Sequence, residues 1–207
     1  MICSVKTLGF TGICGNLISA ECYISNGLPG FDIVGLPDAS VKEARDRVRA
    51  AAKSSGLTFP VSRITVNLAP ASLKKAGTHY DLPILLSILA ASGAVRRPRS
   101  TSAFLGEVGL DGSIRSISGV LPMALEAKRA GIQALFVPAE NASEATLANG
   151  PAIYPVRTVR ELADALNGEI QLQPQPAWEP ELEGETLLDF KDVLGQENAE
   201  LQDSARS

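Results

Sequence analysis

The residues with the most chemical potential lie close together, between positions 74 and 81. Lys74 and Lys75 precede a predicted helix start that carries His79 and Asp81, and His79 is the only histidine of the chain. Backbone N–H groups and the helix dipole favour anions at such a start, so one interpretation is an anion site or an acid–base pair. In the other interpretation, Asp81 stabilises the first helical turn, His79 packs at or near the surface, and the lysines are solvated. We favour the second, because no further residue completes a catalytic set.

Two groups of basic residues could bind phosphate. Four recur at the spacing of one helical face: Lys42, Arg45, Arg49 and Lys53. Three more form a cluster in a predicted loop: Arg96, Arg97 and Arg99. Glu43 and Asp46 lie beside the first group, so a solvated or internally paired surface is the alternative interpretation. Because the net charge is −4, DNA binding requires a local basic patch or partner subunits.

The sequence gives no support for a metal site or a bound cofactor. Cys3, Cys14 and Cys22 lack metal-ligand spacing and are predicted to be buried thiols. The phosphate-binding loop Gly-x-x-x-x-Gly-Lys-Ser/Thr does not occur, so we expect no ATP hydrolysis by this chain alone. We find no signal peptide, and the apolar run Leu82–Ala91 is too short to span a bilayer, so we expect a cytoplasmic protein.

Hydrophobic periodicity predicts an α/β fold in which a mixed sheet packs against helices. Strands are expected at residues 2–9, 16–25, 31–36, 63–68, 103–109, 112–117 and 134–137, with a small strand near Ile153. Three main helices are expected near 38–55, 78–93 and 119–130, and two short ones at 141–148 and 157–167. Asp38 and Thr78 are predicted N-caps, and Asp111-Gly112 predicts a hairpin turn.

The chain changes character after Gly168. Residues 1–168 form the predicted domain, whereas residues 169–185 contain prolines among glutamine and glutamate and are predicted to be a linker. Apolar content returns in residues 186–207. We therefore expect the beginning of a second module there, and an amino-terminal piece of a longer protein.

Several separated segments resemble the YifB/ComM family of magnesium-chelatase-like AAA+ ATPases. They are the opening stretch, Gly27–Asp38 with the helix after it, and Asn67–Pro70 through Gly77-Thr-His-Tyr-Asp-Leu-Pro83. Leu188–Asn198 looks like the entry into the family's ATPase module. The resemblance implies an N-terminal Lon-protease-like domain, with the two-layer α+β fold that Lon shares with a small-ribosomal-subunit protein.

The stretch Gly106–Asn141 resembles the proteolytic domain of Lon peptidases. In those enzymes a catalytic lysine lies two residues after the glycine that is Gly119 here, and this chain has Leu121 instead. The position of the catalytic serine aligns with His79 or Tyr80. Because neither His79 nor Tyr80 is a serine, and Leu121 is not a lysine base, the resemblance implies a degenerate protease site without peptidase activity.

The family resemblance implies a non-catalytic accessory domain of a ComM-like ATPase, a DNA branch-migration motor in natural transformation and recombination. It implies a ring of full-length subunits, a hexamer, with DNA as partner and no membrane association. ATP and Mg are expected in the ATPase module rather than in this chain. Two alternatives remain: a regulatory or ATPase subunit related to magnesium chelatase, and a degenerate peptidase domain used as a protein-binding module.

Overall fold

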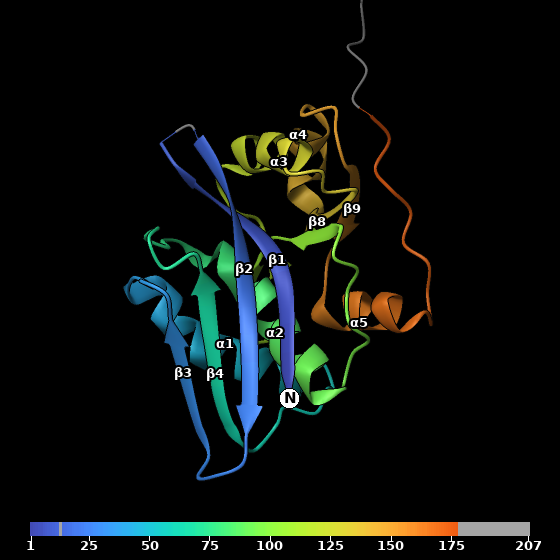
Figure 1. Ribbon diagram of the computed structural model, residues 1–207. Helices are drawn as coiled ribbons and strands as arrows, with labels where there is room; N and C mark the ends of the chain where they lie inside the picture. Colours follow the sequence, from blue (N-terminus) through green and yellow to red (C-terminus); the bar gives the residue numbers. More distant parts are fainter. Residues whose placement is uncertain (13, 178–207) are drawn as a thin grey trace, which may run out of the picture.

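A mixed sheet of seven strands organises the computed structural model, which describes residues 1–12 and 14–177 (Figure 1). Its strands are β1 Ile2–Thr11, β2 Cys14–Ser25, β3 Gly30–Val34, β4 Arg63–Ala69, β5 Ser102–Phe104, β8 Ala134–Pro138 and β9 Ala152–Val156. Their spatial order is β3-β4-β2-β1-β5-β8-β9. β2 runs antiparallel to β1 and β4, and the other neighbours are parallel. The predicted mixed α/β sheet is confirmed.

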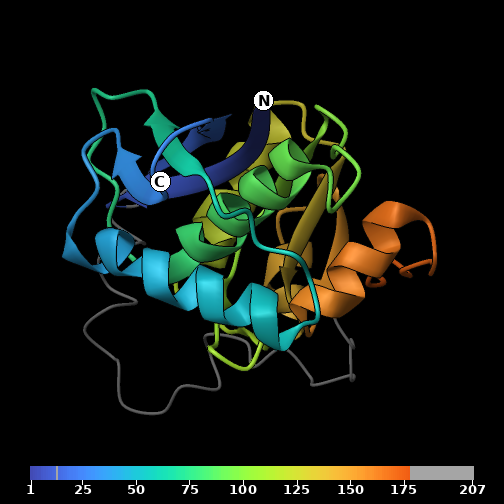
Figure 2. The same ribbon diagram turned by 90° about the horizontal axis from the view of Figure 1, so that it is seen from below.

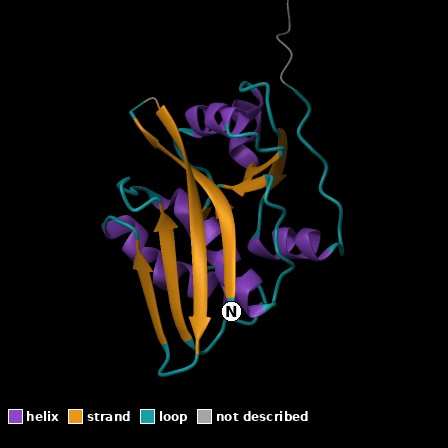
Figure 3. Cartoon of the chain, in the orientation of Figure 1, coloured by secondary structure: helices purple, strands orange, loops and turns teal. Residues whose placement is uncertain are grey.

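Helices cover the two halves of this sheet differently. They are α1 Ala39–Ser54, α2 Asp81–Ser92, α3 Val120–Arg129, α4 Ala142–Thr146 and α5 Val159–Asn167, with 3-10 turns η1 Thr78–Tyr80 and η2 Ala139–Asn141. α1 and α2 cover one face of β3, β4 and β2, whereas α3 packs against the opposite face of β1 and β2 near their hairpin end (Figure 3). Around β5, β8 and β9, one hydrophobic core contains α2 and α5, and a second contains α3 and α4. The sequence predicted one sheet layer and one helix layer. Around β5, β8 and β9 the structure has three layers, because helices pack on both faces of the sheet.

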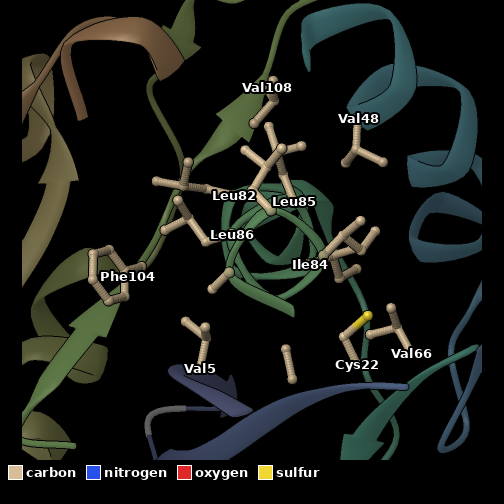
Figure 4. Packing of buried hydrophobic residues seen from close by; sticks show 14 of the residues in the cluster. Val5, Cys22, Val48, Val66, Leu82, Ile84, Leu85, Leu86, Phe104 and Val108 are labelled. Carbon is tan, nitrogen blue, oxygen red and sulfur yellow. The ribbon is translucent and has the colours of Figure 1, made fainter. Parts of the chain in front are cut away.

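The helix α2 forms the centre of the larger core (Figure 4). Every residue from Asp81 to Ala91 is buried, as expected for a helix that is apolar on nearly all sides. Val5 and Cys22 of the sheet contact it from below in Figure 4, and Val48 of α1 lies to one side. Gly93 ends the helix in the left-handed conformation, with φ 82°.

Local signals in the sequence account for α1. The carboxylate of Asp38 accepts a hydrogen bond from the Val41 N–H at 3.0 Å, which confirms it as the N-cap. The predicted apolar stripe is buried: Val41, Ala44, Val48, Ala51 and Ala52. The remaining face of α1 is directed away from α2 and lies on the outside of the molecule (Figure 2).

Two predicted elements differ from the structure. Thr78 does not cap α2; it begins η1 after Gly77, and α2 itself begins at Asp81. The strand expected at 103–109 is divided at Gly106. The Gly106 N–H donates a hydrogen bond to the His79 carbonyl, and the Gly106 carbonyl accepts one from the Leu82 N–H, so this residue is attached to the junction of η1 and α2. Only β5 stays in the main sheet, while β6 Glu107–Val108 and β7 Ile114–Arg115 form the predicted hairpin as a separate ribbon.

Two further expectations concern the ends of the domain and the membrane. Residues 169–177 lie within the structure, and the predicted second module, residues 186–207, lies outside the described residues. No helix within residues 1–12 and 14–177 combines the length and apolar character that crossing a bilayer requires.

Candidate functional site

The two residues aligned with the catalytic serine of Lon, His79 and Tyr80, are both buried in η1. Their rings are in contact, with centroids 4.0 Å apart. Among the described residues, His79 Nε2 has no hydrogen-bond partner. Burial lowers the pKa of His79 to about 4 and raises the pKa of Tyr80 well above its ordinary value. Near neutral pH the imidazole is therefore uncharged and the phenol protonated, so neither side chain is an activated nucleophile.

Phe10 of β1 occupies the space beside His79. Its ring stacks on the imidazole with centroids 6.1 Å apart and an interplanar angle of 30°. The same ring lies against Gly119 at the start of α3, where an added Cβ would come within 2.7 Å of it. Phe10 thus separates the His79 position from the helix that carries Leu121. The sequence interpretation missed Phe10, although an aromatic residue at the end of an alternating strand was a usable signal.

In the described part of the chain, the contacts of Leu121 include no lysine amine. The Leu121 side chain packs against the smaller core, and its N–H donates to Glu144 Oε1 at 3.0 Å. Lys128, the nearest lysine along α3, directs its amine to the Ala148 carbonyl at 3.4 Å. The three protease-site positions are therefore brought to one region of the fold, but with packing contacts in place of a serine–lysine pair.

Asp81 lies in the first turn of α2, as expected, but its side chain is also bound by a second helix. Its side chain is completely buried and accepts two hydrogen bonds from the Arg47 guanidinium of α1, at 2.7 and 2.9 Å. Burial raises the pKa of Asp81, and the Arg47 hydrogen bonds oppose that shift. The partner was missed because Arg47 lies 34 residues earlier in the chain, outside the basic face recognised on this helix. This bidentate pair fixes α1 against α2.

Lys75 is also a correction, because it was expected to be solvated. Its side chain is fully buried, and its amine donates to the Pro70 carbonyl. Lys74 is exposed, as expected. Nearby, the Ser40 hydroxyl donates to Asp38 and accepts from the Gly77 N–H at 3.2 Å. These contacts hold the loop before η1 against the start of α1.

The basic face of α1 is exposed over its whole length, at Lys42, Arg45, Arg49 and Lys53. Within the described residues, none of the four forms an ion pair; Glu43, a predicted neighbour, pairs instead with Arg47 at 3.8 Å. The Arg45 guanidinium donates to the Phe31 carbonyl at 3.4 Å. The Arg49 guanidinium lies over the Phe59 ring, 5.8 Å from its centroid. We call these four residues the α1 basic face.

The second basic cluster lies in the loop after α2, away from α1 (Figure 2). Arg96 and Arg97 are exposed; the Arg96 N–H donates to Asn167, and the Arg97 guanidinium donates to the Ile2 carbonyl at 2.9 Å. With Arg99 they line a groove of about 540 Å³ that also contains Phe136 and Tyr154. The structure therefore does not unite the two groups into one basic surface.

The cysteines divide into two kinds. Cys3 and Cys22 are buried, as predicted, and burial raises the pKa of Cys22 to about 12, so its thiol stays protonated. Cys14 is exposed near the tip of the β1–β2 hairpin, where the prediction of a buried thiol is wrong. In the part of the chain that the structure describes, no three histidine, cysteine, aspartate or glutamate side chains gather in a metal-binding arrangement.

Comparison with known proteins gives a consistent set of relatives. A family model described as subunit ChlI of Mg-chelatase matches residues 20–141. The competence protein ComM of Haemophilus influenzae is 38% identical over 193 residues, covering 91% of this chain and 38% of that protein. The YifB protein of Salmonella typhimurium is 40% identical over 194 residues, covering 93% and 38%. The Lon protease of Mycolicibacterium smegmatis is 27% identical over 174 residues, covering 79% and 22%.

The match to ComM and YifB extends along nearly all of this chain, but the chain spans only 38% of the length of each of these two relatives. The Lon match agrees with the observed mixed sheet and its helices.

Proposed function

This chain belongs to the magnesium-chelatase-like family that includes ComM and YifB, and on that premise we propose that it is the non-catalytic N-terminal domain of a ComM-like AAA+ ATPase. In this proposal the complete protein migrates DNA branch points during natural transformation and recombination. The domain contributes contacts to DNA and to neighbouring subunits rather than bond-breaking chemistry.

The arrangement at the former protease site supports a non-catalytic role. His79 and Tyr80 are buried, Leu121 packs into a core, and the Phe10 ring lies between these positions. A peptide substrate would have to displace Phe10 from His79 before it could reach the imidazole. The same contacts argue against a protein-binding module that uses this cleft.

The observation that carries the DNA proposal is the α1 basic face. Four cations on one side of a helix, without ion pairs to the described residues, present a charged row about 16 Å long. Such a row matches a phosphate backbone, whose contacts depend on charge rather than on sequence. In a ring of identical subunits, proposed here to be a hexamer, a weak contact is repeated and the total affinity rises.

The remaining parts of the proposal concern the complete protein. ATP and Mg²⁺ would bind in a nucleotide-binding module beyond this domain, and the protein would act in the cytoplasm. The family match and the length of the relatives motivate these statements.

Replacing Arg45 and Arg49 with glutamate in the full-length protein tests the DNA proposal. We expect weaker binding to all DNA sequences alike, because phosphate contacts are lost. The slope of log affinity against log salt concentration should fall by roughly 1.8 for two lost contacts, measured by fluorescence anisotropy on duplex DNA.

A matched control replaces Arg129 and Arg160 with glutamate. These exposed arginines pair with carboxylates of their own helices and do not belong to the α1 basic face, although Arg160 lies near Gly56 after the end of α1; the change in net charge is identical. The control should bind DNA nearly normally. If the α1 double variant folds and assembles but keeps its affinity and salt slope, the α1 basic face is only a solvated surface.

The family match also favours a second candidate, an ATPase or regulatory subunit related to magnesium chelatase. If this function is correct, insertion of Mg²⁺ into a porphyrin requires the complete protein and its ATP hydrolysis. Stimulation of porphyrin metallation, with no effect of DNA on ATP hydrolysis, would favour this candidate over a DNA motor.

A further inference from the structure

A hollow of about 350 Å³ opens beside the C-terminal half of α1. Arg49 and Lys53 of the α1 basic face form one side, and Leu57, Phe59, Pro60 and Pro29 supply apolar walls. None of the residues that line it is acidic. The hollow is therefore continuous with the row of cations and has an apolar interior.

Phe59 is held in place within this hollow. Its ring packs against the larger core and contacts Phe31, with centroids 6.2 Å apart. The Arg49 guanidinium lies over the same ring at 5.8 Å from the centroid, an arrangement that keeps the cation beside the hollow. Val61 at the rim is 84% exposed, so an apolar surface is already presented to solvent there.

A ligand for this surface must combine a line of negative charges with a flat apolar group. Single-stranded DNA has both, and proteins that bind it commonly pair a basic groove with aromatic side chains on which bases stack. In a duplex the bases are paired and stacked on one another, so they cannot enter such a hollow. An acidic peptide with one aromatic side chain could fill the hollow, but it would not need the cations that continue along α1 to Lys42.

We propose that this hollow receives an unstacked base of single-stranded DNA, with Phe59 as the stacking surface and the α1 basic face, including the Arg49 guanidinium displaced from that ring, contacting the neighbouring phosphates. The proposal rests on the proposed function, since it assigns a preferred form of DNA to the same surface. In this proposal Phe59 provides the preference for single-stranded over duplex DNA, and the four cations provide the affinity for DNA of either form.

The test compares Phe59→Leu with the wild type in the full-length protein, using oligothymidine and a duplex of equal length. Leucine keeps an apolar wall but removes the stacking surface, so single-strand affinity should fall about 5- to 10-fold, with duplex affinity unchanged within about twofold. A 2-aminopurine base in the single strand should be quenched by the wild type and much less by the variant.

Tyr154→Leu is the matched control, because Tyr154 is a partly buried aromatic residue in the other basic groove. It should leave both affinities unchanged. If Tyr154→Leu rather than Phe59→Leu lowers single-strand affinity, the proposal is overturned. A tryptophan-containing acidic peptide that competes with DNA at lower concentration than oligothymidine, in a Phe59-dependent manner, also overturns it.

The Arg45→Glu, Arg49→Glu variant separates the two hypotheses. If it weakens binding to both forms of DNA while Phe59→Leu changes neither, only the base site is wrong. If it changes neither affinity, the α1 basic face does not contact DNA, and both the proposed phosphate contacts and the base site beside them are wrong. Should Phe59→Leu fold poorly, Phe59→Met keeps a longer apolar side chain without an aromatic ring, and the same selective loss of single-strand affinity is expected.

Discussion

His79 occupies a position at which the resemblance to Lon places a serine, and its surroundings remove its acid–base chemistry. The imidazole lies between Phe10 and Tyr80, and within the described residues its Nε2 has no partner. Burial dominates its lowered pKa, although the Asp38 carboxylate acts in the opposite direction. His79 thus packs as an uncharged side chain, and its contribution to the free energy of unfolding depends on pH.

We expect the folded chain to lose stability on acidification through His79. The folded-state pKa of about 4 lies below the ordinary value of 6.5, so the unfolded chain binds the proton first as pH falls. Between pH 8 and pH 5 this amounts to about 2 kcal/mol of unfolding free energy. Urea unfolding at both pH values should show that loss in the wild type and not in His79→Gln.

Other titrating groups are common to both proteins, and this chain has no second histidine. The difference between the two pH profiles therefore isolates His79. Parallel profiles would mean that the imidazole can reach solvent and charge in the folded state.

At the scale of elements, α1 has two separate roles on two faces. Its apolar stripe and Arg47 attach it to α2, and its basic face is left to solvent. The Asp81 carboxylate lies at the first turn of a helix that is otherwise almost entirely apolar, and its hydrogen bonds from described residues come from Arg47 and from the Val108 N–H at 3.4 Å. The position of the α1 basic face therefore depends on the Arg47–Asp81 ion pair, although neither residue is part of that face.

Replacing Arg47 with methionine should destabilise the fold strongly. The substitution keeps the length of the side chain but leaves a fully buried carboxylate without its counter-charge, at a cost of about 3 to 5 kcal/mol. Glu43→Gln removes the exposed member of the other Arg47 pair and should cost less than about 1 kcal/mol. Chemical denaturation of both variants measures the comparison.

A second substitution, Asp81→Leu in the Arg47→Met background, should recover part of the lost stability because the buried charge is gone. If Arg47→Met costs no more than Glu43→Gln, the pair does not fix α1 against α2.

For the molecule as a whole, the predicted boundary at Gly168 omits residues that pack on the domain. The segment 169–177 continues from α5 without regular secondary structure. The Leu172 side chain packs against the larger core, and the Gln175 N–H donates to the Ile153 carbonyl of β9 at 2.7 Å. These contacts cover part of the outer edge of β9.

A chain ending at residue 168 should therefore be less stable than one ending at residue 177. The loss of Leu172 packing and of one hydrogen bond predicts about 1 to 3 kcal/mol, measured by urea unfolding. Leu172→Ala in the longer chain should reproduce most of this difference. Equal stability of the two chains would show that the segment contributes nothing to the fold.

Local patterns in the sequence determined most of the helices and strands. The Asp38 cap and the apolar stripe placed α1, the apolar run placed α2, and Asp111-Gly112 placed the hairpin, because each depends on residues close together in the chain. The prediction of a degenerate protease site at Leu121 also came from the sequence, through its resemblance to Lon.

Tertiary structure alone decided the surroundings of the charged and aromatic residues. Phe10 reaches His79 across 69 positions, Arg47 reaches Asp81 across 34, and Phe59 meets Arg49 beyond the end of α1. Burial of Lys75 likewise depends on the loop folding back against Leu36 and Asp38. Periodicity reports which face of one element is apolar, whereas charge state and stacking depend on which other elements the sheet order brings against that face.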